Sequence, residues 1–206
     1  MRGGREHGRP AFDSGDGDRR RRAAAYHRRM IPERLSREVL YTSPWVNLVV
    51  DRVRTKSGRI LERMHVVDVE LDGVAVVLED AARRVAMVRV PRYATGTCEW
   101  EVPEGRAAAG EALEDAARRE TLEETGWTSA DYERLHTFHP VPGLSNHVLH
   151  VFRARAVAHA GGIDEDEIDE VRWFELDEIR AMVRERRVLD GFTLLALFLH
   201  LQDRGA

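Results

Sequence analysis

Cysteine, lysine and long apolar runs are scarce in this 206-residue chain. The single cysteine, Cys98, excludes an internal disulfide framework. The longest apolar stretch, residues 194–199, is far shorter than the roughly 18 residues that span a bilayer. A chain of this length can bury enough surface to fold around its own hydrophobic core. We therefore expect a cytoplasmic protein that folds without disulfides and has no membrane contact.

Charge is unevenly distributed along the chain. Residues 1–30 carry nine arginines against four acids, whereas the whole chain has a formal net charge of −4. This composition, without hydrophobic periodicity, predicts a disordered Arg-rich tail over 1–30 and one globular domain over 31–206. The run at 19–22 lacks interleaved aromatics and a following apolar segment, so we expect neither nucleic-acid binding nor a secretion signal. Met30 is an alternative start of translation.

Alternating apolar residues mark the first strands. They lie at 46–50 and 60–67, on either side of the turn sequence Lys56-Ser57-Gly58, and predict a β-hairpin. The continuous apolar runs 74–78 and 85–90 suit strands that are buried on both faces. Further strands are expected at 147–156 and 171–174.

One helix is predicted in the middle of the chain and two at its end. The first runs from about Glu111 to Thr125 and stops at Gly126, since glycine favours the position after a helix end. The closing helices are expected at about 177–187 and 191–202. Strands before and after a central helix predict an α/β protein with helices packed on the faces of a sheet.

The central helix turns carboxylates toward its apolar side. At about 100° per residue, Glu120 and Glu124 share a face with Leu113, Ala116 and Ala117. A solvated acidic face would predict the opposite orientation, because burying carboxylates costs free energy. A hard divalent cation bound through oxygen ligands removes this conflict.

These residues resemble the Nudix hydrolase motif G-x5-E-x7-R-E-U-x-E-E-x-G-U, where U is usually apolar. At about 0.1 per position, seven such matches arise by chance in roughly one chain in 10⁵. The U positions hold Thr121 and Trp127. All seven fixed positions match, at Gly105, Glu111, Arg119, Glu120, Glu123, Glu124 and Gly126.

The resemblance implies the Nudix fold, an α/β/α sandwich with a mixed central sheet, and hydrolysis that depends on Mg²⁺, with Mn²⁺ as the alternative ion. It implies that Glu120, Glu123 and Glu124 bind the metal together with the main-chain carbonyl of Glu104. Glu111 and Arg119 would orient these carboxylates.

The flanking segments resemble the ADP-ribose pyrophosphatase subgroup. The resemblance lies in the Arg-bearing segment before the motif, in Glu101-Val102-Pro103-Glu104-Gly105 and in the loop with Pro142 and Gly143. It implies that Pro142 and Gly143 border the substrate. Arg92 is a candidate for contacts to the substrate phosphates or ribose, with a solvated strand end as the alternative. For Trp45, Trp100 and Tyr93, the alternatives are stacking on a nucleobase and simple packing.

The chain departs from this subgroup at His147, where the subgroup's loop usually ends in Glu. In this family an acidic loop can supply the general base, and residues 164–167 stand at a matching place. We predict Glu165 as the base and Glu167 as a further metal ligand; the alternative is an acidic turn next to a strand.

The resemblance as a whole implies a nucleotide-sugar substrate, most simply ADP-ribose cleaved to AMP and ribose 5-phosphate. It also implies a homodimer in which residues 38–70 complete the partner's site. Another nucleoside diphosphate derivative, such as a GDP-sugar or a dinucleotide, or a nucleoside triphosphate, is the first alternative. A module that senses ADP-ribose without cleaving it is the second.

Overall fold

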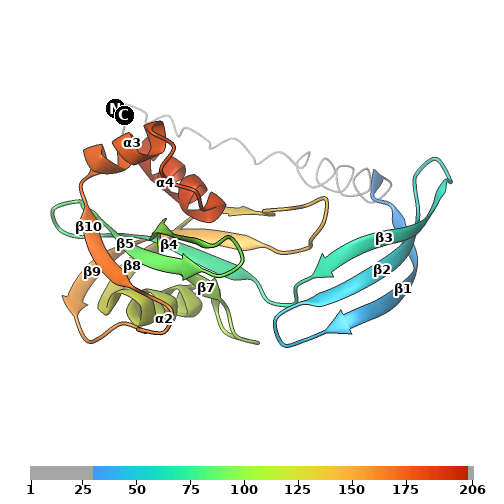
Figure 1. Cartoon of the computed structure of the whole chain (residues 1–206), viewed down its shortest axis with the longest axis horizontal. Coiled ribbons are helices and arrows are strands. Elements are labelled where there is room, and N and C mark those ends of the chain that lie inside the picture. Colours follow the sequence, from blue (N-terminus) through green and yellow to red (C-terminus); the bar gives the residue numbers. More distant parts are fainter. Residues whose placement is uncertain (1–29, 204–206) are drawn as a thin grey trace, which may run out of the picture. The chain divides into compact units, whose positions relative to one another are not determined.

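The structure is a computed structural model that describes residues 30–203. The predicted Arg-rich tail thus lies outside the described residues except for Met30. The described chain forms two compact units, one of residues 30–41 and 48–65, the other of residues 42–47 and 66–203 (Figure 1). The assignment of 31–206 to one domain stays a prediction. Within 30–203, no helix is both long and apolar enough to cross a membrane.

The first unit is built on a three-stranded sheet in the order β1-β2-β3. The predicted hairpin is confirmed, with its turn at Gly58 in the left-handed region (φ 84°). Arg37 donates two hydrogen bonds of 2.8 Å to the buried carboxylate of Asp51 across the sheet, which lowers the pKa of Asp51. The strands are β1 (Glu33–Thr42), β2 (Asn47–Arg54) and β3 (Ile60–Asp68).

The second unit contains a mixed sheet with the strand order β10-β5-β4-β9-β8, to which β6 adds beside β5 and β7 beside β4. β4 and β9 run parallel, and β4 and β5 antiparallel. The strands are β4 (Gly73–Glu79), β5 (Val85–Arg92), β6 (Thr97–Glu101), β7 (Glu104–Arg106), β8 (Trp127–Phe138), β9 (Leu149–His159) and β10 (Glu170–Phe174).

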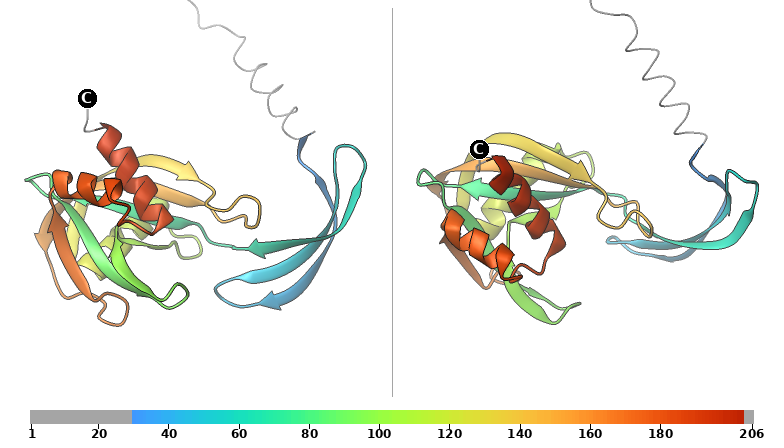
Figure 2. Two further views of the ribbon diagram at one scale, coloured as in Figure 1. Left: turned by 45° about the horizontal axis from the view of Figure 1, so that its top comes forward. Right: turned by 90° about the horizontal axis from the view of Figure 1, so that it is seen from above.

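Helices cover both faces of this sheet. They are α2 (Leu113–Thr125) on one face and α3 (Leu176–Arg184) with α4 (Gly191–Asp203) on the other (Figures 1 and 2). Alternate residues of a strand point to opposite faces. In β4, Val74 and Val76 pack in the cluster that includes Ala116 and Ala117 of α2. The predicted α/β/α sandwich is thus confirmed.

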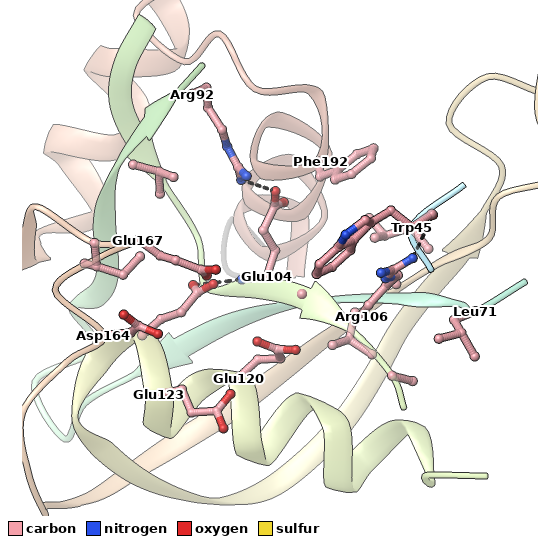
Figure 3. A pocket seen from close by; sticks show the side chains of 18 of the residues that line it. Trp45, Leu71, Arg92, Glu104, Arg106, Glu120, Glu123, Asp164, Glu167 and Phe192 are labelled. Atoms are coloured by element: carbon pink, nitrogen blue, oxygen red, sulfur yellow. Dashed lines mark hydrogen bonds and ion pairs between the residues drawn. The ribbon is translucent and has the colours of Figure 1, made fainter. Parts of the chain in front are cut away.

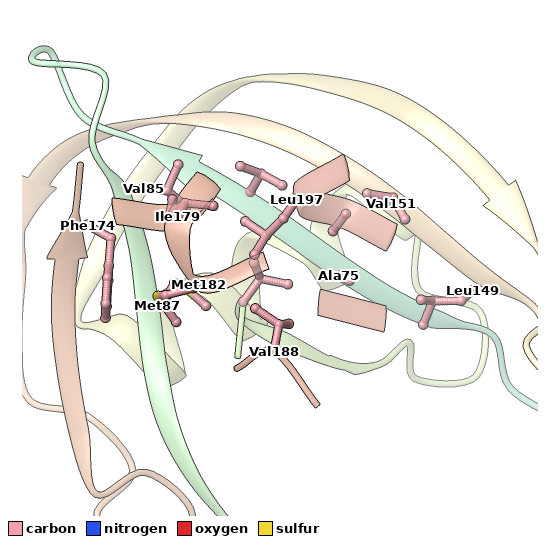
Figure 4. Packing of buried hydrophobic residues seen from close by; sticks show 13 residues of the cluster. Ala75, Val85, Met87, Leu149, Val151, Phe174, Ile179, Met182, Val188 and Leu197 are labelled. Carbon is pink, nitrogen blue, oxygen red and sulfur yellow. The ribbon is translucent and has the colours of Figure 1, made fainter. Parts of the chain in front are cut away.

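The opposite face of β4 packs under α3 and α4. Ala75 and Val77 belong to a cluster with Ile179 and Leu197, all nearly inaccessible to solvent (Figure 4). Because both faces of β4 and β5 are covered, their apolar runs need no alternation, as predicted. Within this sandwich, α2 lies against β4, β5, β7 and β8.

The element boundaries differ little from the predictions. α2 begins at Leu113 and ends before Gly126, which has φ 71° and donates its N–H to the carbonyl of Leu122. The predicted stop is confirmed, because a left-handed residue favours glycine. The strands β1, β6, β7 and β8 were not predicted.

Candidate functional site

α2 presents its motif carboxylates at graded depths. Ala116, Ala117 and Thr121 are fully buried against the sheet, and Glu124 on the same side is 7% exposed. The Glu120 side chain is mostly buried, whereas that of Glu123 is half exposed. The predicted orientation, with two carboxylates on the buried side, is therefore confirmed. α2 thus places three carboxylates in a row from the interior to the surface.

β7 approaches α2 so closely that the Glu120 carboxylate occupies the space that a side chain at Gly105 would need. A Cβ atom added to Gly105 would lie 2.1 Å from the Cδ atom of Glu120. One residue earlier, the main-chain N–H of Glu104 donates a 3.1 Å hydrogen bond to Oε2 of Glu124. Two motif carboxylates are therefore packed against the backbone of one short strand.

Arg119 donates hydrogen bonds to three carboxylates of the motif. Its Nη1 donates to Glu120 (2.8 Å) and Glu123 (3.0 Å). Its Nε and Nη2 form a bidentate pair with Glu111 at 3.1 and 3.0 Å, and Nη2 also donates to the carbonyl of Arg106 at 2.9 Å. A planar guanidinium suits such a forked arrangement. This geometry fits the predicted role of Glu111 and Arg119 in orienting the carboxylates.

Burial makes the ionised carboxylates costly. Burial raises the pKa of Glu124 to about 8. Burial also raises the pKa of Glu120, although the hydrogen bond and the charge of Arg119 act in the opposite direction. The negative charge of Glu167 adds to both shifts, so this residue lies in the same field. A bound cation reverses such shifts, because it favours the ionised form. The donor set is made of oxygens, as Mg²⁺ prefers, so the residues fit a hard divalent cation.

The carboxylates open into a cavity of about 1060 Å³. Figure 3 shows Glu120, Glu123, Asp164 and Glu167 around one end of it and Trp45 at the other. Of the acidic loop, Asp164, Asp166 and Glu167 line the cavity, whereas Glu165 is exposed and is not among the lining residues. The structure thus brings Glu167 to the site, and not Glu165.

Arg92 lines the cavity, and its guanidinium is paired with carboxylates of the protein itself. Its guanidinium contacts Glu101, with Nε 3.2 Å from both carboxylate oxygens, and also pairs with Glu104. Asp190 directly precedes α4. One carboxylate oxygen from each of Glu101, Glu104 and Asp190 lies within 4.8 Å of the other two. Sequence reasoning missed this quartet, because its members come from β5, β6, β7 and the residue before α4.

The two residues predicted to border the substrate do not line the cavity. Pro142 and Gly143 are exposed and are not among the lining residues, whereas His147 is. Burial lowers the pKa of His147, whose Nε2 has no hydrogen-bond partner among the described residues.

The three aromatic residues considered for stacking on a nucleobase have different surroundings. Trp100 packs edge-on against Phe174, with ring centroids 5.0 Å apart, so its role is packing. Trp45 lines the cavity, is 72% exposed, and carries the guanidinium of Arg106 at 4.7 Å from its ring centroid. Arg106 also donates a 2.8 Å hydrogen bond to the Trp45 carbonyl. Tyr93 lines the cavity and is fully exposed.

Comparison with known proteins agrees with this geometry. The model of the NUDIX domain family matches residues 70–193, which is more than half of the chain. The chain is 30% identical over 170 residues to "Methanol dehydrogenase activator" of Bacillus methanolicus, covering 81% of this chain and 91% of that protein. It is 28% identical to "ADP-ribose pyrophosphatase" of Bacillus subtilis (strain 168), covering 82% and 92%.

A solved structure described as an ADP compounds hydrolase superimposes with a TM-score of 0.74 at 18% identity, covering 83% of this chain and 92% of that one. This likeness supports the fold. Together with the intact motif and the cavity that it lines, the family match shows that the chain belongs to the Nudix hydrolase family.

Proposed function

We propose that this Nudix hydrolase cleaves the pyrophosphate bond of a nucleoside diphosphate sugar, with ADP-ribose as the substrate and AMP and ribose 5-phosphate as the products. One observation carries the proposal. The motif carboxylates of α2, the backbone of β7 and the loop residue Glu167 all border one cavity, whose 1060 Å³ exceeds most small-ligand sites. A two-part substrate with a central diphosphate suits such a cavity.

Mg²⁺ is the proposed ion, with Mn²⁺ as the alternative. Glu120, Glu123, Glu124 and Glu167 would hold it, together with the main-chain carbonyl of Glu104. When bound, the ion would neutralise phosphate charge and activate water. Arg119 donates hydrogen bonds to Glu120 and Glu123 and so orients both carboxylates, which would lower the entropic cost of assembling the site.

The loop 164–167 is the proposed source of the general base. Glu165 was predicted for this role, and Glu167 competes with it because Glu167 lines the cavity. A base must lie within hydrogen-bond reach of the attacking water, directly or through one other water. Substituting each residue separately decides between them.

Trp45 is the proposed stacking surface for the nucleobase. Arg106 lies over the indole and hydrogen-bonds the Trp45 carbonyl, while Trp45 is 72% exposed and lines the cavity. Stacking of a base on an aromatic side chain contributes about 1–3 kcal/mol. The diphosphate would then extend from Trp45 toward α2.

We also propose a homodimer. The β1–β3 unit exposes apolar side chains, among them Val39 (60% exposed) and Tyr41 (57% exposed). Apolar side chains exposed together on a sheet often mark an interface. A monomeric mass in light scattering at working concentrations would contradict this part of the proposal.

The direct test is turnover of a substrate panel: ADP-ribose, a GDP-sugar, a dinucleotide and a nucleoside triphosphate, with product analysis. The proposal expects the highest kcat/KM for ADP-ribose. Preference for another member would reject ADP-ribose and keep the Nudix reaction. Binding of ADP-ribose with no cleavage of any member would favour a sensing module instead.

A further inference from the structure

Among the described residues, Arg106 is the one arginine lining the cavity that forms no salt bridge with a carboxylate. The cavity is lined by Arg92, Arg106 and Arg119, and salt bridges join Arg92 and Arg119 to glutamates. The Arg106 guanidinium donates instead to two main-chain carbonyls, that of Trp45 at 2.8 Å and that of Pro44 at 3.5 Å. A carbonyl accepts a hydrogen bond but carries no charge that would neutralise a guanidinium. The positive charge of Arg106 is therefore available to an anion in the cavity.

The acidic residue beside the strand partner of Arg106 is directed elsewhere. Arg106 of β7 pairs with Gly73 of β4, and Asp72 precedes Gly73. The Asp72 carboxylate lies 3.0 Å from Nε2 of His150. A guanidinium has five N–H donors, and the two carbonyls use two of them. The others have no partner in the part of the chain that the structure describes, so Arg106 has donors as well as charge to offer a ligand.

Arg106 connects the motif helix with Trp45. Its main-chain carbonyl accepts a 2.9 Å hydrogen bond from Nη2 of Arg119, and Gly105 before it lies against the Glu120 carboxylate. Its guanidinium lies 4.7 Å from the centroid of the Trp45 ring. In Figure 3 the Arg106 side chain lies between the labelled side chains of Trp45 and Glu120. A ligand that stacked on Trp45 and reached the carboxylates of α2 would therefore pass this guanidinium.

The two ends of the cavity differ in charge. At the motif end, the carboxylates proposed to bind the metal repel a phosphate until a cation is bound. At the other end, the guanidinium of Arg106 attracts a phosphate, and its planar fork matches the geometry of phosphate oxygens. The end of the cavity at Trp45 can therefore recognise a nucleotide without help from a metal ion.

Resting on the proposed function, we propose that Trp45 and Arg106 form a half-site that binds a nucleoside 5′-monophosphate without a divalent ion. The exposed indole stacks on the base, and Arg106 donates hydrogen bonds to the 5′-phosphate. The Ser43 hydroxyl accepts hydrogen bonds from the N–H groups of Trp45 (3.2 Å) and Val46 (3.0 Å), so the position of this turn does not depend on Arg106 alone. The same half-site binds the AMP part of ADP-ribose, which makes the product AMP a competitive inhibitor.

Titration calorimetry in EDTA tests the half-site with AMP and adenosine, which differ by the phosphate. Arg106→Ala should weaken AMP binding at least about tenfold and adenosine binding less than about threefold, whereas Trp45→Ala should weaken both. Arg180→Ala, a matched change on α3 outside the cavity lining, should leave both within about twofold. Equal weakening of AMP and adenosine by Arg106→Ala would give Arg106 only a role in holding Trp45 and overturn the inference. Failure of AMP to bind the wild type in EDTA would overturn it as well.

Inhibition kinetics give a second readout. AMP should inhibit ADP-ribose cleavage competitively, and Arg106→Ala should raise the inhibition constant of AMP and the KM of ADP-ribose together, at least about tenfold. The value of kcat should stay within about threefold, because this contact is present in the ground state and in the transition state alike. A lower kcat at unchanged KM would contradict the inference. If the wild type cleaves no ADP-ribose, the proposed function fails while the titrations still decide the role of Arg106.

Discussion

Oε2 of Glu124 accepts a 3.1 Å hydrogen bond from the main-chain N–H of Glu104, which joins the end of the motif helix to the strand that precedes it. The bond links two residues that are twenty positions apart in the sequence, and the segment between them contains Glu120 and Glu123. Glu124 is 7% exposed and still faces the cavity. The hydrogen bond from β7 therefore orients the Glu124 carboxylate at the cavity, where it would bind an ion.

Gly105→Ala should disable the site without unfolding the protein. The new Cβ would collide with the Glu120 carboxylate, the far end of a flexible side chain, which can swing away. We expect a loss of kcat/KM of about 10–100-fold and a higher Mg²⁺ concentration for half-maximal activity. Gly161→Ala, at a position with open space, is the matched control. Wild-type metal dependence in Gly105→Ala would refute the close-approach argument.

Arg119→Lys should show whether Arg119 acts by orienting the motif carboxylates or only through its positive charge. Lysine keeps the positive charge but cannot hold Glu111, Glu120 and Glu123 at once with a planar fork. We expect activity to fall by about 10–100-fold with a small change in melting temperature. Arg118→Lys on the same helix, whose guanidinium pairs with Glu114, should lose less than about threefold. Equal effects in the two variants would argue against an orienting role.

Metal-free protein should become less stable as the pH rises from about 5 to about 8. Burial raises the folded-state pKa of Glu124 from its ordinary 4.5 to about 8. The neutral acid therefore favours folding fully below pH 4.5, and this contribution is lost as the pH rises through about 8.

Melting curves in EDTA should show that Glu124→Gln reduces this decline. Added Mg²⁺ should stabilise the wild type more at the higher pH, because protons compete with the ion for the carboxylate. An identical pH profile for wild type and Glu124→Gln would show that Glu124 is not the group responsible.

The general base can be located with two substitutions. Whichever of Glu165→Gln and Glu167→Gln removes the base should lower kcat by about 10²–10⁴ while leaving the melting temperature unchanged. Glu167→Gln should in addition weaken Mg²⁺ binding, because the Glu167 charge acts on Glu120 and Glu124. A loss below about threefold in Glu165→Gln would reject the original assignment of the base to Glu165.

The motif helix was predictable because its information is local. The spacing of Glu120 and Glu124 with Ala116 and Ala117 places all four on one side of a helix, and Gly126 ends that helix, as the structure shows. Continuous apolar runs likewise predicted the central strands, because burial on both faces removes the need for alternation.

Long-range contacts escaped prediction. Arg92 and Asp190 are almost a hundred residues apart. The pairing of β5 with β6 brings Arg92 to Glu101, and α4, whose Thr193 hydroxyl accepts a hydrogen bond from the N–H of Val102, brings Asp190 there. β8 was missed because its register against β9 shifts between Thr128 and Ser129 and again further on, which breaks strict alternation. The exposure of Glu165 next to the lining residue Glu167 depends on loop geometry that spacing alone does not define.

The most direct test incubates purified protein with ADP-ribose and Mg²⁺, beside Glu124→Gln, and separates the products by chromatography. We predict AMP and ribose 5-phosphate from the wild type and a loss of at least about 100-fold in the variant, whose amide cannot replace a buried anionic ligand. Intact ADP-ribose after incubation with the wild type, or unchanged cleavage by Glu124→Gln, would contradict the account.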